Sequence, residues 1–95
     1  MEIKMIKIVD SFAENKDIAR EIRLNKIIPA LEMNEEIVLD FEKIEGITQS
    51  FIHALISDVM RKYGVDVLDR IVFKNCNENV KKIISIVVEY MQEID

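Results

Sequence analysis

The stretch from Ile37 to Gly64 constrains the fold more than any other part of the chain. It begins with a short apolar run, IVLDF, which is bounded by polar residues and is typical of an interior strand covered on both faces. Residues 51–63 then carry apolar side chains at helical spacing, and Gly64 is a natural left-handed helix stop. The loop EKIEGITQ joins the two elements. In open α/β sheets, a loop between an interior strand and a helix is where functional groups are placed.

Strands and helices are also predicted to alternate in the N-terminal part of the chain. Residues 2–9 (EIKMIKIV) predict a first strand, which is less regular and therefore suits an edge of the sheet. Apolar residues at helical spacing predict a helix over residues 17–28. Pro29 cannot continue the hydrogen-bond ladder, so this helix either ends near Ile28 or bends there, and an end is favoured.

The C-terminal third predicts one more strand and one more helix. Residues 70–74 (RIVFK) form the third strand, and residues 80–94 form the last helix, capped by Asn75 with Glu78 three positions later. The order β-α-β-α-β-α predicts a single α/β domain over residues 1–95 with a mostly parallel sheet. Three helices cover both faces of such a sheet incompletely, so we expect some apolar surface to remain for a partner.

Composition decides between several classes of protein. With 49% hydrophobic and 33% charged residues, the 95-residue chain is a globular domain with one core. Its apolar runs are far shorter than the roughly 18 residues that a membrane helix needs. No positively charged segment followed by an apolar run opens the chain, which argues against a signal peptide. We therefore expect a cytoplasmic protein that does not bind a membrane.

The ionisable residues argue against nucleic acids, metals and nucleotides as ligands. The net charge of −5 is spread over interleaved acids and bases, without a basic stripe that could neutralise phosphates. One cysteine, Cys76, and one histidine are too few for an intramolecular disulfide or a multi-cysteine metal site. The loop EKIEGITQ has one glycine and no Gly-Lys-Ser/Thr ending, which argues against a nucleotide-binding loop. No cofactor is expected.

The candidates for catalysis are few. Ser50 and His53 are three positions apart on the predicted helix, which is close enough for side-chain contact. They lack the third, orienting group and the oxyanion donors that nucleophilic catalysis requires. We therefore expect no enzymatic activity.

Two local patterns predict structure rather than chemistry. Ser50 or Thr48 is expected to cap the helix N-terminus. Asp40, which closes an apolar strand, is expected to accept hydrogen bonds from backbone N–H groups of residues 44–49 and so to fix the shape of the loop.

In the last helix, three apolar residues lie off the buried stripe and are expected to be partly exposed, as a surface for self-association or for a partner: Ile86, Val88 and Tyr90.

The segment IVLDF-EKIEGITQSF-IHALISDVM resembles the central part of STAS domains. It is closer still to a STAS-like family of unknown function from bacteria and archaea, in which a strand ends in Asp-Phe and a helix starts with Ile-x-x-Ser-Phe. Here these are Asp40-Phe41 and residues 47–51. The later segment RIVFKNCNENVKKII resembles the next strand, an Asn-containing turn and the final helix of the family. The resemblance spans roughly residues 36–90 and implies a small α/β STAS-like fold.

STAS domains include the anti-sigma-factor antagonists, which dock on an ATP-binding kinase of the anti-sigma type and are switched by phosphorylation of a serine at this helix start. The usual sequence there is Asp-Ser-Ser-Gly. Aligned on Ser50, this chain has Thr48 for the Asp, Gln49 for the first Ser and Phe51 for the Gly. Only the second serine, the one that is usually phosphorylated, has a counterpart. The resemblance thus implies a phosphorylation candidate at Ser50, within a partner surface made of Glu45, Gly46, Thr48, Gln49, Ser50, Phe51 and His53.

By this resemblance the chain would be a non-enzymatic regulatory module that docks on an anti-sigma-type kinase or a sensor ATPase. One alternative is a constitutive scaffold or assembly subunit that uses the apolar last helix, also in a homo-oligomer, and is never phosphorylated. Another is a small-ligand or lipid carrier. A deep apolar cavity would favour the carrier, whereas a flat exposed patch around Ser50 would favour docking.

Overall fold

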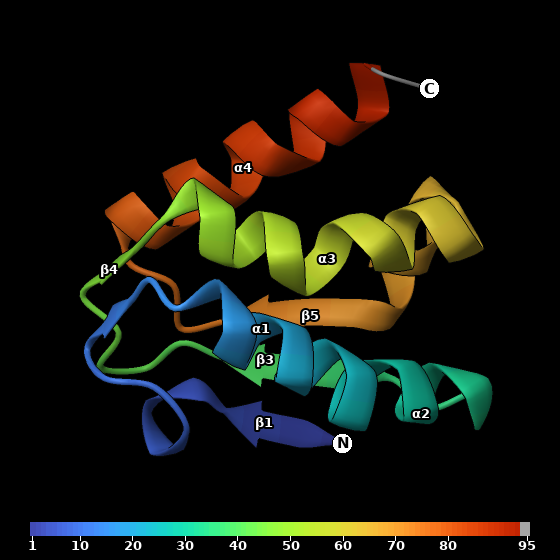
Figure 1. The fold of residues 1–95 in the computed structure, drawn as a ribbon, viewed down its shortest axis with the longest axis horizontal. Coiled ribbons are helices and arrows are strands. Elements are labelled where there is room, and N and C mark those ends of the chain that lie inside the picture. The colour runs from blue at the N-terminus through green and yellow to red at the C-terminus, as the bar shows by residue number, and fades with distance from the viewer. Residues whose placement is uncertain (94–95) are drawn as a thin grey trace.

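A computed structural model describes residues 1–93 of the chain (Figure 1). The elements alternate along the sequence as expected, with short additional ones between them. In chain order they are β1 (Glu2–Lys4), a 3₁₀ turn (Met5–Lys7), β2 (Phe12–Ala13), α1 (Lys16–Ile22), a π-helical segment (Arg23–Ile27), α2 (Ile28–Glu32), β3 (Ile37–Asp40), β4 (Gly46–Ile47), α3 (Gln49–Tyr63), a 3₁₀ segment (Val65–Arg70), β5 (Ile71–Lys74) and α4 (Glu78–Glu93). The predicted end of the last helix, at residue 94, lies outside the described residues.

The main sheet has three parallel strands in the order β1-β3-β5, so the predicted α/β fold with a parallel sheet is confirmed. β3 is the central strand and β1 lies at an edge, as predicted. β1 is shorter than expected, because the chain turns into a 3₁₀ helix at Met5. A second parallel pair, β2 with β4, was not predicted from the sequence, since two residues per strand are too few to show an alternating pattern.

The helices cover only one face of the main sheet. Aligned residues of neighbouring strands project to the same side. The row that contains Leu39 is packed into the core, whereas the neighbouring row that contains Val38 and Val72 faces outward, with Val72 41% exposed. On this open face an ion pair of 3.0 Å between Glu2 and Lys74 reaches across β3. The expectation that the central strand is covered on both faces is therefore wrong. The apolar surface that was expected to stay uncovered is one whole face of the sheet.

The helices lie side by side, with α3 between α1 and α4 (Figure 1). α3 begins at its N-cap Thr48 and ends at Gly64, whose φ of +85° is readily accessible to glycine. Its buried apolar residues form the centre of the core and are Phe51, Ile52, Leu55, Ile56, Val59 and Met60. α4 adds a narrower buried stripe of Val80, Ile84, Val87 and Met91. Among residues 1–93, no helix is long and apolar enough to cross a lipid bilayer.

The first helical run does not end near Ile28. It continues from α1 through the π segment into α2, and Ile28 itself is helical, with φ −61° and ψ −46°. In a π turn the N–H bonds the carbonyl five residues back, and the ladder must then shift to the α-helical spacing. Pro29, which has no N–H to donate, lies at this shift, where the run continues into α2.

The difference between the two sheet faces can be tested with two alanine variants. Leu39 is fully buried, so Leu39→Ala should lower the free energy of unfolding by about 2–5 kcal/mol through a cavity in the core. Val72→Ala, on the open face, should lower it by less than about 1 kcal/mol. Urea unfolding followed by circular dichroism measures both values. Similar losses for the two variants would mean that the second face is also packed.

Candidate functional site

The loop between β3 and α3 lies at the carboxyl edge of the sheet, next to β2 (Figure 1). Its backbone is bonded to the segment around β2: the N–H groups of Glu45 and Gly46 donate to the Ser11 carbonyl, at 2.7 and 3.3 Å. The N–H of Thr48 donates to the Ala13 carbonyl at 3.0 Å. Backbone hydrogen bonds alone therefore attach the loop to the N-terminal segment.

Asp40 holds the start of this loop, but through donors other than those predicted. It is 4% exposed and accepts hydrogen bonds from the Glu42 N–H at 2.9 Å and from the Asn75 side-chain amide at 3.0 Å. None of the predicted donors, in residues 44–49, bonds Asp40 in the structure: the Ile44 N–H bonds the Phe41 carbonyl, and those of Glu45, Gly46 and Thr48 bond the carbonyls of Ser11 and Ala13. The Asn75 amide first, and the Glu42 N–H second, lower the pKa of Asp40.

The turn between β5 and α4 holds the other side of the loop. Asn77 caps α4, because its Oδ1 accepts the Val80 N–H at 2.9 Å. Its side-chain amide donates to the carbonyls of Ile44, at 3.2 Å, and Glu45, at 3.0 Å. The prediction that Asn75 caps α4 is therefore wrong. Asn75, with φ +59°, instead directs its amide to Asp40.

The residues predicted to contact a partner divide into two groups. Glu45, Gln49 and Ser50 are exposed, and Gly46, Thr48 and His53 are half-buried. Phe51 is fully buried and belongs to the core, so its inclusion in the partner surface is wrong. The helical spacing of residues 51–63 had placed Phe51 on the apolar side of the helix, and for this residue the spacing was a better guide than the family motif.

Ser50 lies in the first turn of α3 with its side chain available. Of the two capping candidates, Thr48 is the N-cap, since its Oγ1 accepts the Phe51 N–H at 3.1 Å. Within residues 1–93, no hydrogen bond uses the Ser50 hydroxyl. Gly46 is needed nearby because the Phe12 ring packs on it: a Cβ there would lie 2.6 Å from Phe12 Cδ1.

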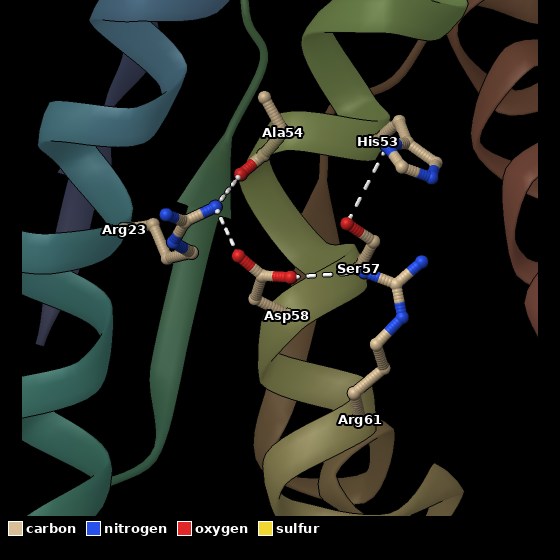
Figure 2. Close-up of polar contacts among 6 residues, drawn as sticks. All are labelled: Arg23, His53, Ala54, Ser57, Asp58 and Arg61. Carbon is tan, nitrogen blue, oxygen red and sulfur yellow. Dashed lines mark hydrogen bonds and ion pairs between the residues drawn. The ribbon is translucent and has the colours of Figure 1, made fainter.

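Two groups of polar contacts lie along α3 (Figure 2). His53 Nδ1 lies 3.5 Å from the hydroxyl of Ser57, which is buried, so its partner is Ser57 and not Ser50. In the second group, Arg23 donates to the Ala54 carbonyl at 2.8 Å and pairs with Asp58 at 3.1 Å. Arg23 comes from the π segment, so this contact fixes α3 against the first helical run.

A groove of about 470 Å³ runs between the start of α3 and the second half of α4. The α3 wall consists of Gln49, Ser50, His53 and Ala54, and Lys16 lies at the start of α1. The α4 wall consists of Ile86, Val87 and Tyr90. The predicted partial exposure of Ile86 and Tyr90 is confirmed, at 37% and 54%, and Val88 is half-buried. Self-association through α4 stays a prediction.

Comparison with known families gives one match: a family model described as a STAS-like domain of unknown function matches residues 19–81. The chain belongs to this family. The match includes β3, the loop between β3 and α3, α3 itself and β5, so the STAS-like resemblance of these elements is confirmed. No curated protein and no solved structure matches the chain. Within this STAS-like domain, four of the residues that line the groove lie outside the matched range: Lys16, Ile86, Val87 and Tyr90.

The lowered pKa of Asp40 predicts an acid-dependent part of the domain's stability. A carboxyl whose folded pKa lies below its unfolded value of 3.8 stabilises the fold above that pH, and the stabilisation is lost as the pH falls through the folded pKa. Asp40→Asn keeps an acceptor but removes the titration. The difference in free energy of unfolding between the native chain and this variant should therefore shrink between about pH 6 and pH 2.

Urea unfolding at several pH values measures this difference. Asn75→Ala is the matched control, because it leaves the carboxyl in place and removes the largest cause of the pKa shift. It should reduce the pH dependence without abolishing it. A difference between the native chain and Asp40→Asn that stays constant with pH would contradict the assignment.

The double role of Asn77 predicts separable effects. Asn77→Asp keeps the acceptor for the Val80 N–H but loses the amide donor to the loop, so amide hydrogen exchange in residues 44–48 should quicken while α4 stays capped. Asn77→Ala should also lose the cap, and should lower the free energy of unfolding by about 0.5–2 kcal/mol. The matched control is Asn15→Ala, which removes the cap of α1. It should leave the ratio of amide exchange rates between the loop and α3 as it is in the native chain. Equal exchange in all three variants would show that Asn77 does not hold the loop.

Proposed function

We propose that this STAS-like domain is a non-enzymatic regulatory module, which docks on a protein partner through the surface around Ser50. This surface comprises the exposed or half-buried residues Glu45, Gly46, Thr48, Gln49, Ser50 and His53. The observation that carries the proposal is the position of Ser50 in the first turn of α3, directly after the loop. Its hydroxyl makes no hydrogen bond within residues 1–93, and it lies beside a groove with exposed apolar side chains.

The rigidity of the loop supports docking. Backbone bonds to Ser11 and Ala13 hold one side of it, and the Asn77 amide holds the other. A partner that binds a pre-ordered surface does not have to order it, so less of the interaction energy is lost on binding. Exposed Ile86 and Tyr90 supply apolar contact area next to the polar loop, a combination that is common at interfaces.

The chemistry of the reactive side chains supports a role without catalysis. His53 is bonded to the buried Ser57, away from the Ser50 hydroxyl. Burial raises the pKa of the Cys76 thiol, which disfavours the nucleophilic thiolate. Asp40, whose pKa is lowered, is occupied by two structural hydrogen bonds and is a weak base.

The resemblance to anti-sigma-factor antagonists supports the class of partner and the switch. We infer a cytoplasmic anti-sigma-type kinase or sensor ATPase as the partner, with Ser50 as the phosphorylated residue. A phosphate there would add about −1.5 to −2 charges at the N-terminus of α3, where the fold tolerates negative charge. A partner packed on Ser50 would have to desolvate that charge, so binding would weaken without a change of fold.

A second candidate is a constitutive scaffold or assembly subunit that uses α4. The exposed Ile86 and Tyr90 favour it, because they are apolar side chains on the solvent-facing side of α4, where a second protein could cover them. A scaffold of this kind differs from the switch in one property: a charge at Ser50 leaves assembly unchanged.

The test is to capture partners from the host with the native chain, Ser50→Asp and Ser50→Ala, and to measure affinities for the captured protein. Ser50→Asp should weaken binding by at least about tenfold, which corresponds to about 1.4 kcal/mol. It should leave the free energy of unfolding unchanged or raise it by about 0.3–1 kcal/mol. Ser50→Ala should bind like the native chain.

Ser85→Asp is the matched control, since it adds the same charge at an exposed serine of α4 that does not line the groove. It should bind normally. Equal affinities of Ser50→Asp and Ser50→Ala would reject the switch and favour the scaffold.

A further inference from the structure

We infer that the groove between α3 and α4 is a binding site for a small amphipathic anion, a molecule with an apolar body and one acidic group. The inference goes beyond the proposed docking function and does not rest on it, because it concerns the isolated chain. It is based on the size of the groove, the separation of polar from apolar residues along its walls, and the sign of its charge.

The groove has the size and the composition of a small-molecule site. Its volume of about 470 Å³ lies within the range of about 300–1,000 Å³ that is usual for such sites. The α4 wall presents Ile86, Val87 and the ring of Tyr90. The facing side presents the polar groups of Gln49 and Ser50 together with Lys16. A ligand would therefore lie with its apolar body along α4 and its polar end towards α1 and the start of α3.

The charge of the groove selects an anion. Among the described residues that line it, Lys16 is the only charged one, and none is acidic. This is unusual in a chain of net charge −5, where acidic residues outnumber basic ones by 18 to 13. An acidic group at this end would meet the Lys16 ammonium and the Ser50 hydroxyl, without a carboxylate to repel it.

The α3 wall is held in place without a ligand. Arg23 bonds the carbonyl of Ala54, one of the lining residues, and thereby fixes α3 against the first helical run (Figure 2). On the other wall, Val87 is anchored in the core, and Asn77 caps the helix that carries it. A pre-formed groove binds a ligand without the loss of energy that ordering its walls would require.

The experiment uses two fluorescent probes that share an aromatic body. Anilinonaphthalene sulfonate carries one negative charge, and N-phenylnaphthylamine carries none. Titration of the folded chain with the sulfonate should give saturable binding at one site per chain. In nuclear magnetic resonance spectra, the shifted amides should cluster at Ser50, His53, Ala54 and Ile86.

Variants separate the two parts of the proposal. Lys16→Gln should weaken binding of the sulfonate by about two- to fivefold and leave the neutral probe unaffected. Ile86→Ser should weaken both probes, by about tenfold. The matched controls are Lys62→Gln, an exposed lysine outside the groove, and Leu24→Ser, an exposed apolar residue on the π segment. Both controls should bind like the native chain, and circular dichroism checks that every variant is folded.

Four results would overturn the inference. They are binding that does not saturate, shifted amides elsewhere on the chain, an equal effect of Lys16→Gln on the two probes, or sedimentation in which the native chain is a dimer and Ile86→Ser a monomer. The last result would mean that a second copy occupies the groove. Partner capture plays no part in these measurements, so failure here leaves the docking proposal standing, and failure of docking leaves this one standing.

Discussion

The hydrogen bonds from the β5–α4 turn to the β3–α3 loop are the contacts on which the site depends. The loop leaves the central strand at a buried carboxylate, and a carboxylate there requires donors. Asn75 supplies one donor to Asp40, and Asn77 extends the connection to the carbonyls of Ile44 and Glu45. Because β5 pairs with β3, the two Asn residues of its turn lie beside the loop, and the same turn starts α4. One strand pairing thus orders the loop, the start of α3 and the position of α4 together.

The sequence predicted the features that repeat over many residues. The alternation of strands and helices, the extent of α3 and its stop at Gly64 follow from periods and stop signals that span several turns. Features that depend on contacts between distant segments were missed. β2 and β4 are only two residues long and exist because they pair with each other. Arg23 of the π segment bonds the Ala54 carbonyl of α3, a contact across 31 positions that no local pattern contains.

The candidate site shows the same division at the level of single residues. The motif around Ser50 indicated the loop, and the periodicity of the last helix indicated the exposed Ile86 and Tyr90. Nothing in the sequence indicated that these are neighbours, because Ser50 and Ile86 lie on different helices of the parallel fold and meet only through packing. The donors to Asp40 were misassigned for a related reason. N–H groups within residues 44–48 bond other carbonyls, so one donor to Asp40 is the Glu42 N–H, two positions away, and the other is the Asn75 amide, 35 positions away.

Shared residues make the two proposals interdependent wherever both hold. Ser50 belongs to the proposed docking surface and also lines the groove, and among the described lining residues Lys16 is the one cation. A phosphate on Ser50 would place its charge where the acidic group of a bound anion would lie, so the two would repel each other and compete for the Lys16 ammonium. Linkage then requires reciprocity: to whatever extent phosphorylation weakens ligand binding, the ligand disfavours the phosphorylated form by the same factor. A small anion in the groove would therefore oppose a phosphate on Ser50 through the same cation, without any change in the fold.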